Sequence, residues 1–185
     1  MKRIILFTLL LIFSMANHAS AQFVLTTKGI RNAENLSKSY VVIPISKTQH
    51  TLYSETKKFL TSKYASAQDV LREAYPDLIS LSSRTYYSLK IGWARVAGKI
   101  DYKINIYFKN FKLKIEFVIV KLHYDGYTMP LQNAKGTSFK YGIFKKNGQI
   151  RDDVGKADIE AIANDFVAYL TAYLNDQGYN SNDNW

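Results

Sequence analysis

Outside the first 21 residues, the side chains best suited to chemistry are two histidines and two short acidic runs. His50 and His123 are far apart in the chain, and neither has a histidine four residues away or a flanking pair of carboxylates, the spacings typical of metal sites. The acidic runs, 152–153 and Asp158 with Glu160, could bind a cation or act as a general acid and base. Acidic side chains are also expected near a helix start, because they stabilise the helix dipole. We therefore predict no catalytic, cofactor-binding or metal-binding residue.

Other reactive groups are missing from the sequence. No Gly-x-Ser-x-Gly motif and no supported Ser-x-x-Lys motif indicates a serine nucleophile, and the glycines are too dispersed for a phosphate-binding loop. The chain has no cysteine, which excludes disulfides, thiolate metal sites, cysteine nucleophiles and a lipid-modified cysteine anchor. We expect no cofactor, and binding or assembly rather than catalysis.

The best candidate for binding is a set of polar side chains on two consecutive strand patterns, Ile100–Lys109 and Lys112–Tyr124. Both segments alternate apolar and polar residues, so each strand should have one apolar face and one solvated face. Ammonium groups beside aromatic rings on an open sheet can bind anions, although lysines also simply keep a sheet face soluble. Six residues of the solvated face form the candidate binding surface, namely Lys103, Asn105, Tyr107, Lys109, Lys112 and Lys114.

Two amphipathic helices are expected to cover the apolar face of this sheet. The first should begin near Lys47, because Ser46 and Gln49 have the spacing of a capping box, and its apolar residues recur at three- and four-residue steps as far as Tyr64. The second should span 156–175, with Gly178 at the position where helices end. A short β-branched run at 40–45 precedes the first helix and predicts a strand.

The segment 69–75 allows two interpretations. Its residues are good helix formers, so propensity alone would extend the first helix, whereas a hairpin through the turn at Pro76 and Asp77 would make it a strand. Leu78–Ile91 then alternates as a half-buried strand does. A loop is expected after Gly126, with a small hairpin around Asn147 and Gly148.

The two ends of the chain differ from the middle. Residues 1–21 have a basic start, a short apolar run and a small-residue cleavage pattern, which predicts a secretory signal peptide. We interpret 22–39 as an arm, 40–178 as one domain and 179–185 as a polar tail. The chain has 25 basic and 15 acidic residues, and removal of the signal peptide would take away only Lys2 and Arg3 among them. No later run approaches the length of a transmembrane helix.

Several stretches of the first 124 residues resemble an exported bacterial family, domain-of-unknown-function family 4468. They are Thr27-Lys28-Gly29-Ile30, Tyr40-Val41-Val42-Ile43, Thr51-Leu52-Tyr53, Tyr64 and Val70. The family's last hairpin, Phe-Lys-Asp-Gly-Arg, corresponds to Phe108-Lys109-Asn110-Phe111-Lys112. The resemblance implies a fold like that of the TATA-binding protein, makes 69–75 a strand and implies no activity.

We therefore expect an α+β fold, a single antiparallel sheet in the order β-α-β-β-β-β-α with both helices on one face. The expected function is that of an exported, periplasmic or extracellular binding or assembly module that engages an anionic envelope component or another envelope protein. Nucleic acid is a poor candidate partner for an exported protein. Two alternatives stay open, a hydrolase of envelope polymers that uses carboxylates, and a structural protein that pairs through a strand edge. The oligomeric state is left open.

Overall fold

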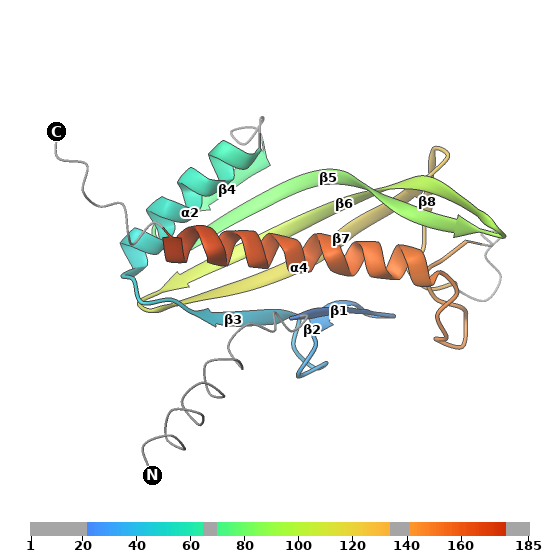
Figure 1. Cartoon of the computed structure of the whole chain (residues 1–185), viewed down its shortest axis with the longest axis horizontal. Helices are drawn as coiled ribbons and strands as arrows, with labels where there is room; N and C mark the ends of the chain where they lie inside the picture. The colour runs from blue at the N-terminus through green and yellow to red at the C-terminus, as the bar shows by residue number, and fades with distance from the viewer. Residues whose placement is uncertain (1–21, 65–69, 134–140, 177–185) are drawn as a thin grey trace, which may run out of the picture.

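The computed structural model describes residues 22–64, 70–133 and 141–176, and Figure 1 shows how their elements are arranged. The signal peptide expected at 1–21, the domain end at 178 and the tail at 179–185 lie outside these ranges. Within them, no helix combines the length and apolar character needed to cross a membrane.

An antiparallel sheet of six strands forms the body of the protein (Figure 1). Five strands run in the order β3-β7-β6-β5-β4, and β8 pairs with the end of β7. The bounds of β5 and β7 are those expected from their alternation, whereas β6 begins at Ala94 rather than at Ile100. The strands are β3 (Tyr40–Pro44), β4 (Leu71–Ala74), β5 (Leu78–Ile91), β6 (Ala94–Lys109), β7 (Lys112–Tyr124) and β8 (Tyr127–Met129).

Two helices, α2 (Gln49–Lys63) and α4 (Asp153–Asp176), lie over one face of this sheet, and α4 crosses most of its length (Figure 1). The apolar residues of β6 and β7 point toward them, and Ile104 and Phe117 are almost completely buried. Leu60 of α2 and Leu170 of α4 are completely buried in the same core. The expected α+β fold, with both helices on one face of an antiparallel sheet, is therefore confirmed.

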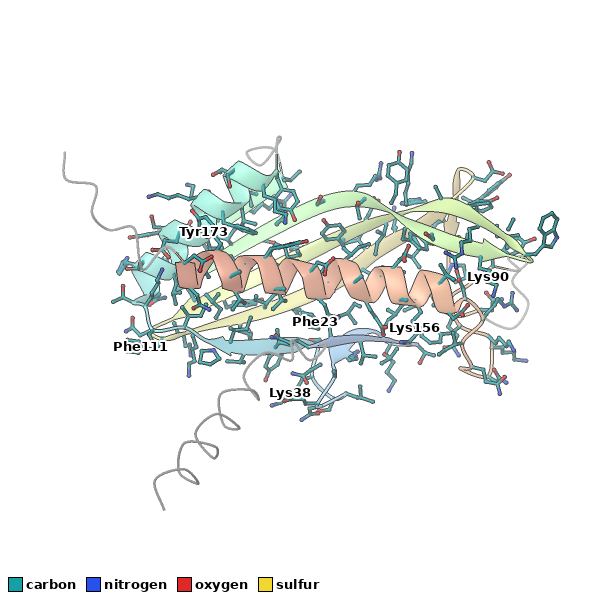
Figure 2. The ribbon with its side chains drawn as sticks, in the orientation of Figure 1. Phe23, Lys38, Lys90, Phe111, Lys156 and Tyr173 are labelled. Atoms are coloured by element: carbon teal, nitrogen blue, oxygen red, sulfur yellow. The ribbon has the colours of Figure 1, made fainter. Side chains whose placement is uncertain are left out.

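Three strands go beyond the expected order, namely β8 and the hairpin of β1 (Phe23–Thr26) and β2 (Gly29–Asn32). This hairpin lies within the segment that we interpret as an arm, and it has the core residues Phe23, Leu25 and Ile30. Asn164 of α4 holds β1 in place, since its Oδ1 accepts from the Phe23 amide at 2.9 Å and its Nδ2 donates to the Phe23 carbonyl at 3.0 Å. Figure 2 shows Phe23 on the side where β1 meets α4.

The start of α2 differs from the expected capping box. Thr48 is the N-cap, and its side chain accepts a hydrogen bond from the Thr51 amide, so the helix begins at Gln49 and not near Lys47. The carbonyl of Lys47 is instead occupied by the amide of Phe111 at 2.9 Å, in the turn between β6 and β7. Because this tertiary hydrogen bond holds Lys47 against the sheet, the first helical turn forms after it. Phe111 lies at this end of the sheet in Figure 2.

The ambiguous segment 69–75 contains the strand β4, so the extension of the first helix suggested by propensity is wrong. β4 pairs with β5 from Leu71 to Ala74, which gives its backbone the hydrogen bonds that a helix would otherwise supply. Its Glu73 carboxylate accepts hydrogen bonds from the hydroxyl of Tyr53 and, at 3.0 Å, from Lys57, both on α2. The long-range pairing therefore outweighs the local helix preference.

The second helix begins at Asp153 rather than at Lys156 and ends at Asp176. Asp152 caps it, because its Oδ1 accepts from the Gly155 amide at 2.9 Å. Before it, the expected turn around Asn147 and Gly148 forms with a single antiparallel bridge between Phe144 and Ile150. Residues 134–140, part of the loop expected after Gly126, lie outside the described ranges.

Candidate binding surface

The structure brings the six predicted residues together on the sheet face opposite the helices. We call this set, Lys103, Asn105, Tyr107, Lys109, Lys112 and Lys114, the open-face cluster. Register pairs Tyr107 with Lys114 and Lys109 with Lys112 across β6 and β7. Lys109 and Lys112 are exposed, and the other four are half-buried, whereas the alternate residues of both strands belong to the core. The alternation therefore sorts these side chains onto the two faces as expected.

Lys114 occupies the centre of the cluster and lies over two tyrosine rings. Its Nζ is 3.8 Å from the ring centroid of Tyr107 and 5.4 Å from that of Tyr40 on β3. The Nζ of Lys38 is also near the Tyr40 ring, 5.9 Å from its centroid. Such cation–π contacts at exposed sites contribute about 0.5–1 kcal/mol each, and they hold the ammonium group near the sheet without neutralising its charge.

A chain of hydrogen bonds crosses the sheet beside these rings. Ser80 of β5 donates to Asn105 Oδ1 at 2.8 Å, and Asn105 Nδ2 donates to Glu116 Oε2 at 3.2 Å. The other oxygen of Glu116 accepts from the Ser39 hydroxyl at 2.8 Å. The carboxylate of Glu116 is thus held by neutral donors from both sides. It orients the amide of Asn105 and, within the described residues, forms no ion pair with a lysine of the open-face cluster.

The lysines of the cluster outnumber the one carboxylate beside them, Glu116, and none of them is paired with it. Across residues 22–64, 70–133 and 141–176, no ion pair includes Lys103, Lys109, Lys112 or Lys114. Lys109 and Lys112 are also directly opposite each other, an arrangement in which like charges repel. This end of the sheet face therefore has a local excess of positive charge that a bound anion would relieve.

Farther along the same face, one carboxylate does have a cationic partner. Arg84 of β5 donates through Nε and Nη2 to both oxygens of Asp101, the second bond at 2.9 Å, and His123 Nε2 lies 3.0 Å from Asp101 Oδ2. We call these three residues the Asp101 triad. The hydrogen bond from Arg84, together with that from His123, holds the pKa of the Asp101 carboxyl well below its ordinary value. His50, the other histidine of the described residues, hydrogen-bonds through Nδ1 to the Tyr75 hydroxyl at 2.7 Å.

The acidic residues near the start of α4 contact separate backbone amides. Asp152 Oδ2 accepts from the Lys90 amide at 3.1 Å, and Asp158 Oδ2 accepts from the Ser88 amide at 2.8 Å. Glu160 Oε1 accepts from the Leu25 amide at 2.7 Å. These carboxylates fasten the helix to β5 and β1. Among the described residues, no group of three or more histidine or acidic side chains is placed to hold a metal ion.

Four residues of this face were not among the predicted six, namely Ser39, Tyr40, Ser80 and Glu116. Glu116 shares the alternation of β7 and was recognisable as part of its solvated face. The other three reach the cluster from β5, from β3 and from the residue before β3. Their neighbours are set by register, which pairs Tyr40 with Glu116 and Ser80 with Asn105. No local pattern in the sequence signals those pairings.

Comparison with known proteins gives a likeness of fold. No protein-family model matches the chain, and no curated protein matches its sequence. Among solved structures, a TBP-like protein from Parabacteroides distasonis superposes with a TM-score of 0.55 at 14% identity, over 73% of this chain and 90% of that one. A domain-of-unknown-function family 4468 protein from Bacteroides ovatus gives a TM-score of 0.47 at 14% identity, over 79% of this chain and 87% of that one. The superposition on the TBP-like protein shows that the chain has the TATA-binding-protein-like fold that its sequence resemblance implies.

Proposed function

We propose that this chain is an exported, non-enzymatic binding module of the cell envelope, and that the open-face cluster holds an anionic partner. The observation that supports this most directly is the group of four lysines without a carboxylate partner, two of them opposite each other at the end of β6 and β7. Export is supported by the signal-peptide pattern at 1–21.

The arrangement of the cluster favours an extended anion over a small one. Its lysines are spread over two strands, and neighbouring strands lie about 4.8 Å apart, so their ammonium groups present a broad array rather than a closed pocket. Tyr107 and Tyr40 add flat apolar surface between the charges. Phosphate groups of lipopolysaccharide or carboxylates of acidic glycans, repeated along one molecule, match such an array.

Charge reversal tests this proposal. We expect the variant with Lys103, Lys109, Lys112 and Lys114 all changed to Glu to lose retention on lipopolysaccharide vesicles and on a polygalacturonate matrix, by about tenfold or more, because each contact becomes repulsive. The matched control changes four exposed cations that have no ion pair in the described structure, Lys58, Lys145, Lys146 and Arg151, to Glu.

The control has the same net charge as the test variant, so the two differ only in where the charges lie. Retention of the control on either matrix, with loss in the cluster variant, supports the open-face site. Equal retention of both variants, or equal loss, would reject it. Thermal unfolding of both proteins checks that neither result comes from a lost fold.

A further inference from the structure

One edge of β7 is open in the middle of the sheet. β3 pairs with β7 along 112–116, and β8 pairs with it along 122–124. Between them, residues 117–121 pair with β6 on one side and with no described strand on the other. An open strand edge presents unpaired amide and carbonyl groups, which are a template for another strand.

A groove of about 500 Å³ lies at this gap. Its floor is formed by β7 from Phe117 to Leu122, one wall by Lys28 and the residues 29–31 of β2, and the other side by Thr128, Met129 and Leu131. The hairpin of β1 and β2 lies beyond the N-terminal end of β3, so β2 borders the gap without pairing with β7 (Figure 1). Ser39, just before β3, closes one end of the groove.

The floor is unusually apolar for a surface position. Val118 and Val120 are 39% and 55% exposed. The register of β6 against β7 shifts here, because Tyr102 pairs with Ile119 while Asp101 pairs with Lys121, so Val120 is an extra residue. Val118 and Val120 share the alternation of Lys114 and Glu116 and therefore lie on the solvated face, and the bulge bends β7 at this point.

The rim of the groove is positively charged. Lys28, Arg31 and Lys121 line it, and none of the described lining residues is acidic. The Nη2 of Arg31 donates to the Lys28 carbonyl at 3.2 Å, which holds the guanidinium at the rim. None of these three cations forms an ion pair within the part of the chain that the structure describes.

We propose that this groove binds an extended acidic peptide segment of another protein, which adds to the edge of β7 as a short strand. Backbone groups of 117–121 would pair with the peptide, its apolar side chains would cover Val118 and Val120, and its carboxylates would meet Lys28, Arg31 and Lys121. Two copies of this chain joined at this groove would instead bring like cations together. The groove adjoins the open-face cluster, since Ser39 lines it and Val118 pairs with Lys103, but the proposed contacts use three cations that are not in the cluster.

Binding of a synthetic peptide tests the charge requirement. The probe is a short acetylated and amidated peptide in which valine alternates with aspartate, carrying a fluorophore and measured by fluorescence anisotropy. The variant with Lys28, Arg31 and Lys121 changed to Glu should bind it more weakly by about tenfold or more. The matched control changes Lys58, Lys145 and Lys146 to Glu and should bind like the unaltered protein. Equal affinity of the two variants would overturn the proposal.

Two N-methylated forms of the probe test the strand pairing. One is methylated at the valine amides and the other at the aspartate amides, so each blocks the hydrogen bonds along one edge of the peptide. Loss of affinity by about tenfold in at least one form supports strand addition, because attraction between charges alone does not depend on the amides. Unchanged affinity of both forms would overturn it.

A third measurement tests whether a second copy of the chain, rather than a peptide, occupies the groove. Sedimentation of the unaltered protein and of the triple charge-reversal variant, over a range of concentrations, should give the same oligomeric state for both. A concentration-dependent dimer altered by that variant would assign the groove to a second copy of the chain and overturn the peptide proposal. Thermal unfolding of the variants shows whether they retain the fold.

Discussion

The two ends of the open sheet face differ in whether their charged side chains have a partner of opposite charge. At one end, the Asp101 triad places a carboxylate between Arg84 and His123, so positive and negative charges lie in direct contact. At the other end, Lys109 and Lys112 lie opposite each other, and Glu116 is held by Ser39 and Asn105. Both ends come from the same strands with the same alternation. What differs is the cross-strand neighbour, and this difference is the basis of our proposal that the lysine end binds an external anion.

The two ends also differ in how closely the core is packed beneath them. Near the Asp101 triad, Gly98 of β6 lies directly over the ring of Tyr87 on β5. A Cβ atom built on Gly98 would be 2.6 Å from Tyr87 Cε1, and Tyr87 is almost completely buried. No glycine occurs between Asp101 and Lys114, so at the lysine end no glycine backbone of β6 or β7 lies this close to a buried ring. We therefore expect the triad end to stabilise the sheet and the lysine end to be available for binding.

Among the variants that test this difference, Gly98→Ala should change the unfolding free energy most. The added methyl group collides with a buried ring, and overpacking of this kind costs about 1–3 kcal/mol of unfolding free energy. Chemical denaturation measures it. The same change in a Tyr87→Leu background should cost less, because the smaller side chain leaves room for the methyl group. Additive costs in the double variant would show that the ring is not the obstacle.

A smaller effect is expected from Asp101→Asn, which makes the triad end resemble the lysine end. The change leaves Arg84 and His123 without their carboxylate and should lower the unfolding free energy by roughly 0.5–1 kcal/mol, as for an exposed ion pair. It should also increase retention on lipopolysaccharide vesicles, because the face gains net positive charge. Unaltered retention would show that the added charge does not reach the bound anion.

The pH dependence of this variant has a defined sign. Folding lowers the pKa of Asp101 below its ordinary value of 3.8, so the carboxylate contributes its full stabilisation above that value. The contribution is lost as the pH falls from 3.8 toward the folded pKa. The difference in unfolding free energy between the unaltered protein and Asp101→Asn should therefore be largest near neutral pH and shrink in acid. A constant difference across that range would argue against the ion pairs.

Sequence reasoning predicted the two-faced strands well, because their alternation is long and local. Ile104 and Phe117 are buried, and Lys109 and Lys112 are exposed, as a period of two requires. It was less successful where distant residues decide the outcome. The start of α2 depends on the hydrogen bond between Lys47 and Phe111, and β4 depends on its pairing with β5.

The candidate surface shows the same division. Its six residues follow from the alternation, but the rings and hydrogen bonds around them do not. Tyr40 meets Lys114, and Ser80 meets Asn105, only because of the order and register of the strands. The groove beside β7 depends on where the pairing of β7 with β3 and β8 ends, and no residue pattern in the sequence predicts those positions. Local periodicity therefore locates faces, and long-range register decides which charges on a face are balanced.

The smallest expected effect comes from Glu116→Gln, which removes the one negative charge within the row that crosses the lysine end. Glutamine is close in size to glutamate, and its one oxygen can accept from the Ser39 hydroxyl. Its amide nitrogen then faces Asn105, whose amide can turn so that its Oδ1 accepts from the glutamine and its Nδ2 donates to the Ser80 hydroxyl. Because every hydrogen bond of the row is kept in this way, the unfolding free energy should change little. Removal of one unit charge at a partly solvated site is worth about 1 kcal/mol or less, so affinity for lipopolysaccharide vesicles should rise by roughly two- to fivefold. The control, Glu34→Gln, removes an exposed charge that has no ion pair in the described structure and should leave retention unchanged. If both variants gain equally, net charge alone governs binding, and the contrast between the two ends has no part in it.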